Sequence, residues 1–227
     1  MLVAIEGMDG SGKSSISKEV AKRVNYKYVD KILKDIYLIP EETFDNLCEQ
    51  VNKSNNETFK AMFYGFQNLL VTLLKGNIFI DKHVLATYFW NGYDENEQLF
   101  NIFVNNGVIP DLTIILYSSI ETRIKHIKLR DKNDKDLFDD KKTSFGYDKM
   151  LDFAEKCSMP YIFINGDPLS FEQIISQIVE LIKVCELLNK EEFLKYCMQR
   201  NIIVFQRDEE LSKKCLGRGI NNEERKR

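Results

Sequence analysis

The sequence lacks the features of a disulfide-rich, nucleic-acid-binding or membrane-spanning protein. Its five cysteines are scattered without a C-x-x-C pair, so we expect reduced thiols rather than disulfides or a cysteine-based metal site. The formal net charge is −3, from 32 Lys and Arg against 35 Asp and Glu, which gives no general reason to bind DNA or an anionic membrane. No apolar run approaches the ~20 residues of a membrane span, and the N-terminus does not fit a signal peptide. These absences predict a soluble cytoplasmic protein with no nucleic-acid or membrane partner.

Short β-rich runs alternate with longer helical patterns along the chain. The runs that predict strands are residues 2–6, 26–29, 77–81, 112–117 and 161–165. Most of them are continuously apolar, as expected for strands buried on both faces of a parallel sheet. The alternation predicts an α/β fold with a mainly five-stranded parallel sheet and helices on both faces.

Several helices can be placed in the sequence. Apolar residues recur at helical spacing from Lys13 onward, residues 57–74 form a long helical pattern before Gly76, and Ser170 with Gln173 predicts a capping box ahead of a further helix. We divide the chain into an α/β domain, residues 1–184, and a C-terminal extension of unknown role, residues 185–227. Within the extension, residues 191–205 predict a helix and a short strand, and the final residues have the composition of a disordered tail.

The stretch GMDGSGKS, residues 7–14, fits the phosphate-binding pattern G-x-x-x-x-G-K-[ST]. It directly follows a predicted strand and opens a predicted helix, which is the context that this pattern needs. Its glycines allow backbone N–H groups to converge on phosphate oxygens, the lysine reaches the β and γ phosphates, and the serine hydroxyl ligates Mg²⁺. The predicted nucleotide-binding residues of this loop are Gly7, Asp9, Gly10, Ser11, Gly12, Lys13, Ser14 and Ser15.

Other motifs narrow the class of nucleotide-using protein. The chain has no N-K-x-D, which argues against a GTPase. The run NIFID ends in Asp81, so a motor or transporter ATPase stays open on this feature alone, but the basic and aromatic residues that follow it are not typical of that class.

Four segments resemble the thymidylate kinase family of P-loop kinases. IEGMDGSGKSS (5–15) is similar to that family's E-G-x-D-G-x-G-K-[ST] loop, DKHVLAT (81–87) to its D-R-[YH]-x-x-S-T segment, PDLTIIL (110–116) to its fourth strand, and YIFINGD (161–167) to its fifth strand and base loop. The resemblance covers residues 1–184. It implies a P-loop kinase fold with a basic lid, ATP as phosphoryl donor, Mg²⁺, and a deoxynucleoside monophosphate acceptor, most often dTMP. Members of the family often dimerise by packing helices, so a homodimer stays open.

The resemblance also implies roles for individual residues. Asp9 and Asp81 would position the acceptor, and Asp81 would join Ser14 at Mg²⁺. Lys82 stands where the family normally has arginine and keeps a positive charge beside the transferred group. Arg123 and Arg130 resemble lid arginines, and the charged segment 130–144 resembles the lid itself. The predicted catalytic residues are therefore Lys13, Asp9, Lys82, Arg123 and Arg130.

The acceptor side departs from the family. Gln67 stands at the place of an arginine that contacts thymidylate, and with Phe66 it resembles the F-Q pair by which deoxynucleoside kinases read a base. The E-P of those kinases and the R-E-P of thymidylate kinases are both missing, and Asp30 or Lys31 would have to replace them. Aromatic residues expected at the nucleobase are Phe63, Tyr64, Tyr88, Trp90 and Tyr147. A deoxynucleoside kinase is thus the first alternative, and a catalytically weak nucleotide-binding regulatory protein is the second.

Overall fold

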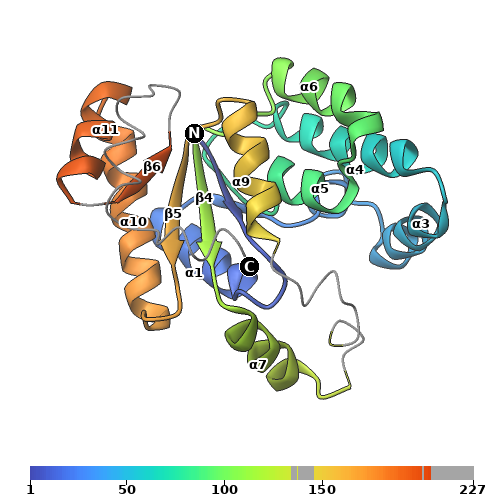
Figure 1. Ribbon diagram of the computed structural model, residues 1–227, viewed down its shortest axis with the longest axis horizontal. Coiled ribbons are helices and arrows are strands. Elements are labelled where there is room, and N and C mark those ends of the chain that lie inside the picture. The colour runs from blue at the N-terminus through green and yellow to red at the C-terminus, as the bar shows by residue number, and fades with distance from the viewer. Residues whose placement is uncertain (134–136, 138–145, 201, 206–227) are drawn as a thin grey trace.

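A six-stranded sheet forms the centre of the protein, seen in Figure 1, a computed structural model that describes residues 1–133, 137, 146–200 and 202–205. In spatial order the strands are β2 (Lys27–Val29), β3 (Ile78–Asp81), β1 (Leu2–Glu6), β4 (Leu112–Tyr117), β5 (Tyr161–Asn165) and β6 (Ile203–Phe205). The first five pair in parallel, which confirms the predicted sheet. β6 adds an antiparallel edge next to β5.

The helices that the sequence predicts begin and end close to the expected positions. α10 starts with the expected capping box, in which Ser170 Oγ accepts from Gln173 N at 3.2 Å and Gln173 Oε1 accepts from Ser170 N at 2.8 Å. α4 ends at Val71, five residues before Gly76. The helices are α1 (Lys13–Val24), α2 (Ile32–Asp35), α3 (Glu41–Lys53), α4 (Glu57–Val71), α5 (Val84–Asn91), α6 (Glu97–Asn105), α7 (Ile120–Arg130), α9 (Tyr147–Lys156), α10 (Phe171–Leu187) and α11 (Lys190–Gln199), with a short 3₁₀ helix η1 (Asp94–Asn96).

Helices cover both faces of the sheet, so the strands are buried on both sides. α1, α10 and α11 pack on one face, while α5, α6 and α9 pack on the other (Figure 1). Along β4, Ile114 and Leu116 point into the first layer and Ile115 into the second. This two-sided burial is the physical reason for the continuous apolar runs in the sequence.

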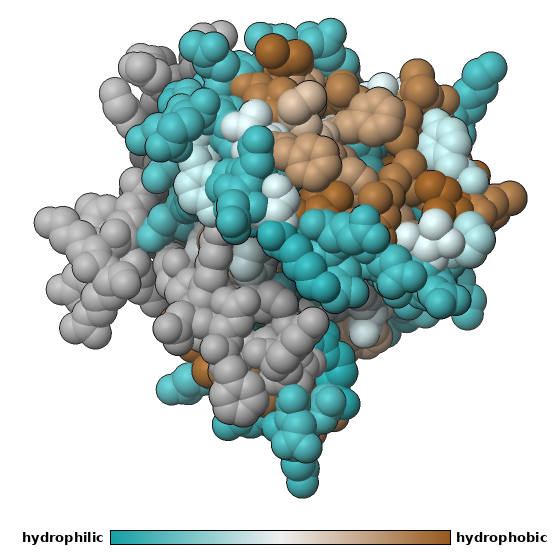
Figure 2. All heavy atoms as spheres, turned by 90° about the vertical axis from the view of Figure 1, so that its right-hand side faces the viewer, coloured by the Kyte–Doolittle hydropathy of each residue, from teal (hydrophilic) through white to brown (hydrophobic). Residues whose placement is uncertain are grey.

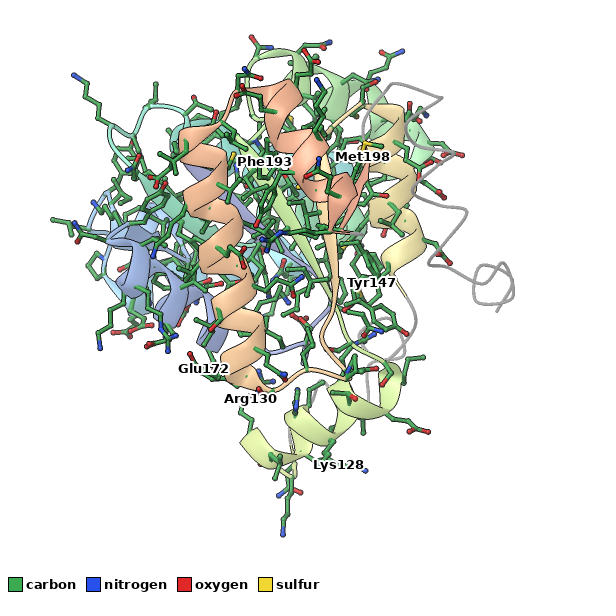
Figure 3. The ribbon with its side chains drawn as sticks, turned by 90° about the vertical axis from the view of Figure 1, so that its left-hand side faces the viewer. Lys128, Arg130, Tyr147, Glu172, Phe193 and Met198 are labelled. Carbon is green, nitrogen blue, oxygen red and sulfur yellow. The ribbon has the colours of Figure 1, made fainter. Side chains whose placement is uncertain are left out.

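The segment 185–205 completes the sheet and its core. α10 runs through the expected boundary at residue 184, and Phe193 and Cys197 of α11 are buried against the layer formed by α1 and α10. Figure 3 shows α11 beside α10, with Phe193 and Met198 labelled. These residues therefore pack as part of the first domain. The tail from 206 lies outside the described residues, as does most of the predicted lid (134–136 and 138–145).

Two absences expected from the sequence can be checked in the described part of the chain. None of its helices combines the length and the apolar character needed to cross a membrane. Its cysteines, Cys48, Cys157, Cys185 and Cys197, are all free thiols.

Candidate active site

The loop between β1 and α1 has a backbone that requires glycine at two positions. Gly7 has φ 143° and Gly10 has φ 83°, both in the region that side-chain-bearing residues rarely adopt. A Cβ atom on Gly7 would lie 2.5 Å from the Leu116 carbonyl oxygen, and one on Gly10 would lie 2.7 Å from the Arg123 carbonyl oxygen. The glycines therefore let the loop curve tightly between β4 and α7.

Lys13 lies inside this curve. Its side chain is buried, and Nζ donates to the Met8 carbonyl oxygen at 2.7 Å and to Ser11 Oγ at 3.4 Å. Ser14 and Ser15 follow at the exposed start of α1, where no described side chain caps the helix and the first turn has no acidic residue. The first N–H groups of α1 are therefore available to phosphate oxygens.

Charged groups of both signs lie near Lys13. Burial and the nearby Lys82 ammonium lower the pKa of Lys13 to about 8, while Asp81, Asp9 and Glu6 act in the opposite direction. Burial raises the pKa of Glu6 to about 7, although the backbone N–H groups of His83, Leu85 and Ala86 act to lower it. A phosphate group added here would favour the charged form of Lys13.

Asp81 ends β3 beside the loop, in register with Ile5 of β1. Its carboxylate is fully buried, and neither oxygen meets a hydrogen-bond partner among the described residues. The Tyr28 hydroxyl is near enough that Asp81 adds to the effect of burial in raising its pKa, but the two groups do not meet in hydrogen-bond geometry.

These orphaned oxygens fit a cation shared with bound phosphates. No group of three or more acidic, histidine or cysteine side chains that would hold a metal occurs in the described part of the chain. Mg²⁺ at phosphate sites typically takes one or two protein ligands and completes its shell with phosphate and water. Asp81 and Ser14 are thus the residues that would hold a Mg²⁺ ion bound together with a nucleotide.

Lys82 directly follows Asp81 and has a left-handed backbone, with φ 67°. Its Nζ lies 2.9 Å from Asp9 Oδ1, and the two side chains are 44% and 17% exposed. Burial alone would lower the pKa of Lys82, but Asp9, Asp81 and Asp30 outweigh it and raise the pKa. The ammonium is therefore held, charged and accessible, at the edge of the phosphate loop.

A cavity of about 690 Å³ opens beside this ion pair. Of the residues expected at the acceptor from the sequence, it contains Asp9, Gln67, Lys82, Tyr64 and Trp90. Its remaining walls come from the segment after β2, the start of α2, α3, α4, β3, α5 and the residues after α5: Asp30, Lys31, Ile32, Phe44, Asp45, Cys48, Asn52, Glu57, Lys60, Asn68, Ile80, Ala86, Thr87, Asn91 and Tyr93. The cavity is large enough for a nucleoside or a nucleotide.

Gln67 supplies the hydrogen-bonding group in this cavity that suits a base edge. It is 9% exposed, and its Nε2 has no partner within the part of the chain that the structure describes. Its neighbours are already engaged, since Asn68 Nδ2 donates to Thr87 Oγ1 at 2.9 Å and the Tyr64 hydroxyl donates to Asn52 Oδ1 at 2.8 Å. A buried, unsatisfied amide is costly, and a ligand with a matching donor and acceptor would satisfy it.

Three of the aromatic residues expected at the base lie elsewhere. Phe63 is outside the cavity lining and packs edge-on against Tyr64, with ring centroids 5.0 Å apart. Tyr88 stacks on Phe153 in the core, with ring centroids 3.8 Å apart. These two positions are corrections to the sequence-based expectation, and the packing of α4 and α5 is their cause.

Tyr147 is the third. It is fully buried at the start of α9, and its hydroxyl accepts from Met8 N and Ser118 N and donates to the Leu116 carbonyl oxygen. Figure 3 labels it where α9 meets the sheet. Tyr147 therefore braces the phosphate loop from behind and does not face a base.

The two arginines of α7 differ in their surroundings. Arg123 is almost fully buried, and its Nε donates to the Asp9 carbonyl oxygen at 3.0 Å, while His126 Nδ1 lies 2.8 Å from the Gly10 carbonyl oxygen. Arg130 is exposed at the C-terminal end of the helix, where Figure 3 labels it. Arg123 thus fastens α7 to the phosphate loop, whereas Arg130 ends the helix, at the first residue of the segment that the sequence predicts to be a lid.

Asp30 and Lys31 follow the end of β2 and line the cavity. From the sequence, these two residues are only possible replacements for the missing E-P and R-E-P motifs. Burial, and then the charge of Asp81, raise the pKa of Asp30. The backbone N–H groups of both residues donate to Asp35 Oδ2, which shapes the turn. The signal that could have placed them is general, because ligands of parallel sheets bind at the carboxyl ends of the strands.

The sequence of this chain is similar to those of known nucleotide kinases. The sequence model of the thymidylate kinase family matches residues 5–178. The probable thymidylate kinase of Methanocaldococcus jannaschii is 28% identical over an alignment of 196 residues that covers 81% of this chain and 96% of that protein. The thymidylate kinase of Mycoplasma capricolum is 25% identical over an alignment of 205 residues that covers 80% of this chain and 94% of that protein.

Solved structures share the fold. The deoxyadenosine kinase of M. mycoides with bound dATP has a TM-score of 0.55 and 22% identity, over 81% of this chain and 100% of that chain. The thymidylate kinase of Ehrlichia chaffeensis has a TM-score of 0.55 and 16% identity, over 81% of this chain and 98% of that chain.

Proposed function

Since the chain belongs to the thymidylate kinase family, and is thereby a nucleoside monophosphate kinase, we propose that it transfers the γ-phosphoryl group of ATP to dTMP in a Mg²⁺-dependent reaction. An oxygen of the acceptor monophosphate forms the new bond to the γ-phosphorus, and the bond from that phosphorus to the β–γ bridging oxygen breaks. The products are dTDP and ADP. The attacking oxygen is already anionic at neutral pH, so the transfer needs no strong general base.

The observation that carries the proposal is the juxtaposition of two sites at one edge of the sheet. The glycine loop with Lys13 is built for the phosphates of a donor, and the 690 Å³ cavity is suited to an acceptor. The Lys82–Asp9 ion pair lies at their junction. Such an arrangement brings two bound phosphates together and places a cation where charge develops.

Each residue at this junction has a proposed task. Lys13 and the N–H groups of the loop hold the β and γ phosphates, and Lys82 contacts the transferred group. Mg²⁺ held by Ser14 and Asp81 would neutralise phosphate charge. Arg123 keeps Asp9 in place, and Arg130 closes over the donor with the lid.

The decisive experiment measures transfer from ATP·Mg²⁺ to each deoxynucleoside and deoxynucleoside monophosphate, with products separated by anion exchange. We expect dTDP from dTMP, with kcat/KM at least about tenfold higher than for the other acceptors. Failure to form any diphosphate would refute the proposal.

A deoxynucleoside kinase is the second candidate, favoured by two features of the cavity. Asp9, Asp30, Asp45 and Glu57 outnumber the lysines in the lining, which suits an uncharged acceptor better than a dianion. Asp30, with its raised pKa, would serve as the general base that a 5′-hydroxyl requires. In the same assay, this candidate predicts dTMP from thymidine, or the corresponding product from another deoxynucleoside.

Gln67 is proposed to read the base edge. Replacing it by leucine, which has a similar size but no hydrogen-bonding group, should leave that edge unpaired and cost about 1–3 kcal/mol. We expect kcat/KM for the acceptor to fall by roughly 5- to 150-fold while KM for ATP stays within about twofold. Gln50→Leu, on the exposed side of α3 outside the cavity, is the matched control. An equal loss in both variants would exclude a role in base recognition.

We also propose that the chain forms a homodimer through an apolar face of α4 and α6. Phe59, Met62 and Phe66 of α4 are 48%, 54% and 53% exposed, and Ile102 of α6 is 56% exposed. Figure 2 shows apolar residues gathered on the side of the molecule that carries these helices. A helix face can pair with its own copy about a twofold axis, and such a patch on a soluble protein marks an interaction surface.

Met62→Glu would place a charge in the middle of this face. We expect light scattering after size-exclusion chromatography to give the mass of two chains for the wild type, and of one chain for Met62→Glu at the same concentration. Leu187→Glu, a matched change at an 81% exposed position on α10, should stay dimeric. A wild type that is monomeric at tens of micromolar would refute the dimer.

A further inference from the structure

Glu6 is a buried carboxylate next to the phosphate loop that the proposed reaction does not use. It ends β1 and is fully buried. Its Oε1 accepts from Leu85 N at 2.9 Å, and its Oε2 accepts from Ala86 N at 3.1 Å. A buried charge of this kind is costly unless it is well satisfied, so the two bonds indicate a specific task.

The two donors belong to the first turn of α5, whose N–H groups have no partner within the helix. The residue before the helix, His83, provides no side-chain cap, and neither of its ring nitrogens has a hydrogen-bond partner in the described part of the chain. Glu6 therefore caps α5 from a neighbouring strand, and its charge also favours the positive end of the helix.

The connection that leads directly into this capped turn carries Lys82. It leaves β3 after Asp81 and passes through Lys82, whose φ of 67° is unfavourable for a residue with a side chain. The Lys82 N–H donates to the Ile5 carbonyl oxygen at 3.0 Å, one residue before Glu6. The end of β1 thus holds both sides of the turn, with the Ile5 carbonyl at Lys82 and the Glu6 carboxylate at the start of α5.

We infer that Glu6 is a positioning residue, which caps α5 and thereby holds the Lys82 ammonium at Asp9 and the mouth of the acceptor cavity. The inference rests on the proposed function for its catalytic consequence, but the placement of Lys82 can be measured without turnover. Glu6 acts through the β3–α5 connection, because its carboxylate is fully buried and does not line the cavity.

A double-mutant cycle with Lys82 tests this coupling. Glu6→Gln keeps the size of the side chain but turns an amide NH₂ toward one of the two N–H donors. We expect kcat/KM for the acceptor to fall at least 30-fold, with the affinity for ATP within threefold. In a Lys82→Ala background, Glu6→Gln should change turnover less than threefold, because the group that it positions is gone. Equal losses in both backgrounds would overturn the inference.

A second readout does not depend on activity. The pKa of Lys82 can be followed by NMR of ¹³C-dimethylated lysines, with Lys82→Arg used to assign the signal. The wild-type pKa is raised by Asp9, Asp81 and Asp30 against burial, and in Glu6→Gln it should fall toward the ordinary lysine value as the ammonium leaves Asp9. An unchanged pKa would overturn the inference, even if the wild type phosphorylates no acceptor and the proposed function fails.

Two further variants separate positioning from a loss of fold. Glu192→Gln changes a carboxylate in the capping box at the remote helix α11, so it should leave turnover and the pKa of Lys82 unchanged. Glu6→Asp keeps the charge but shortens the reach, so we expect it to retain part of the activity. If Glu6→Gln does not fold, Glu6→Asp takes its place in the cycle and in the NMR experiment, with the same criteria.

Discussion

Lys13→Ala should lower kcat for phosphoryl transfer by about 10³-fold or more, because it removes a preorganised cation from the donor phosphates. The structure gives this lysine a fixed place. It is buried inside the loop, and Nζ is held by the Met8 carbonyl oxygen at 2.7 Å. Its charge costs little further reorganisation at the moment of transfer, since the loop already surrounds it. The measurement is single-turnover transfer at saturating ATP and acceptor.

The fold should survive this change. Burial lowers the pKa of Lys13 to about 8, which means that the folded protein disfavours the charged form before phosphate binds. We therefore expect the melting temperature of Lys13→Ala to stay close to that of the wild type. Lys22→Ala, an exposed lysine on the last turn of the same helix, is the control and should keep full activity. Transfer above a tenth of the wild-type rate in Lys13→Ala would show that the loop does not hold the reacting phosphates.

The parts of this site that the sequence predicts are those with local physical causes. The loop from Gly7 to Ser14 is one, because its glycines, lysine and serine act within eight residues. The five parallel strands are another, since burial on both faces leaves a continuous apolar run in each. Gln67 reaches the cavity because it shares a helix face with Lys60 and Tyr64, as the spacing of i, i+4 and i+7 requires.

The parts that escape prediction depend on contacts between distant segments. α5 is short and mostly apolar, so its sequence lacks the helical periodicity from which a helix could be predicted. Without that helix the direction of Tyr88 cannot be predicted, and the sequence places it at the base although it packs on Phe153. Tyr147 follows a long charged segment, and no local sequence pattern predicts where the chain re-enters the core after it. In the structure Tyr147 lies behind the phosphate loop. From the sequence, Glu6 can be recognised only as the last residue of a strand, because its hydrogen-bond donors are about 80 residues away along the chain.

Replacing Lys82 should lower activity by an amount that depends on whether the new side chain keeps a positive charge. The ammonium lies 2.9 Å from Asp9 at the junction of the two sites, so Lys82→Ala should lower kcat by about 10²- to 10³-fold. Lys82→Arg keeps a cation and the residue type that the family normally has, so it should retain activity within about tenfold. A similar loss in Lys82→Arg and Lys82→Ala would mean that charge is not what this position supplies.

Lys82→Gly removes the same charge but relieves the backbone. A left-handed conformation costs a residue with a Cβ about 1–2 kcal/mol, and glycine adopts it freely. We expect Lys82→Gly to lose activity as Lys82→Ala does, yet to exceed Lys82→Ala by about 1 kcal/mol in the free energy of unfolding measured in urea. Equal stability of the two variants would show that the turn is not strained. If glycine is the more stable variant and is inactive, the protein accepts a strained residue at position 82 because the reaction needs its ammonium there.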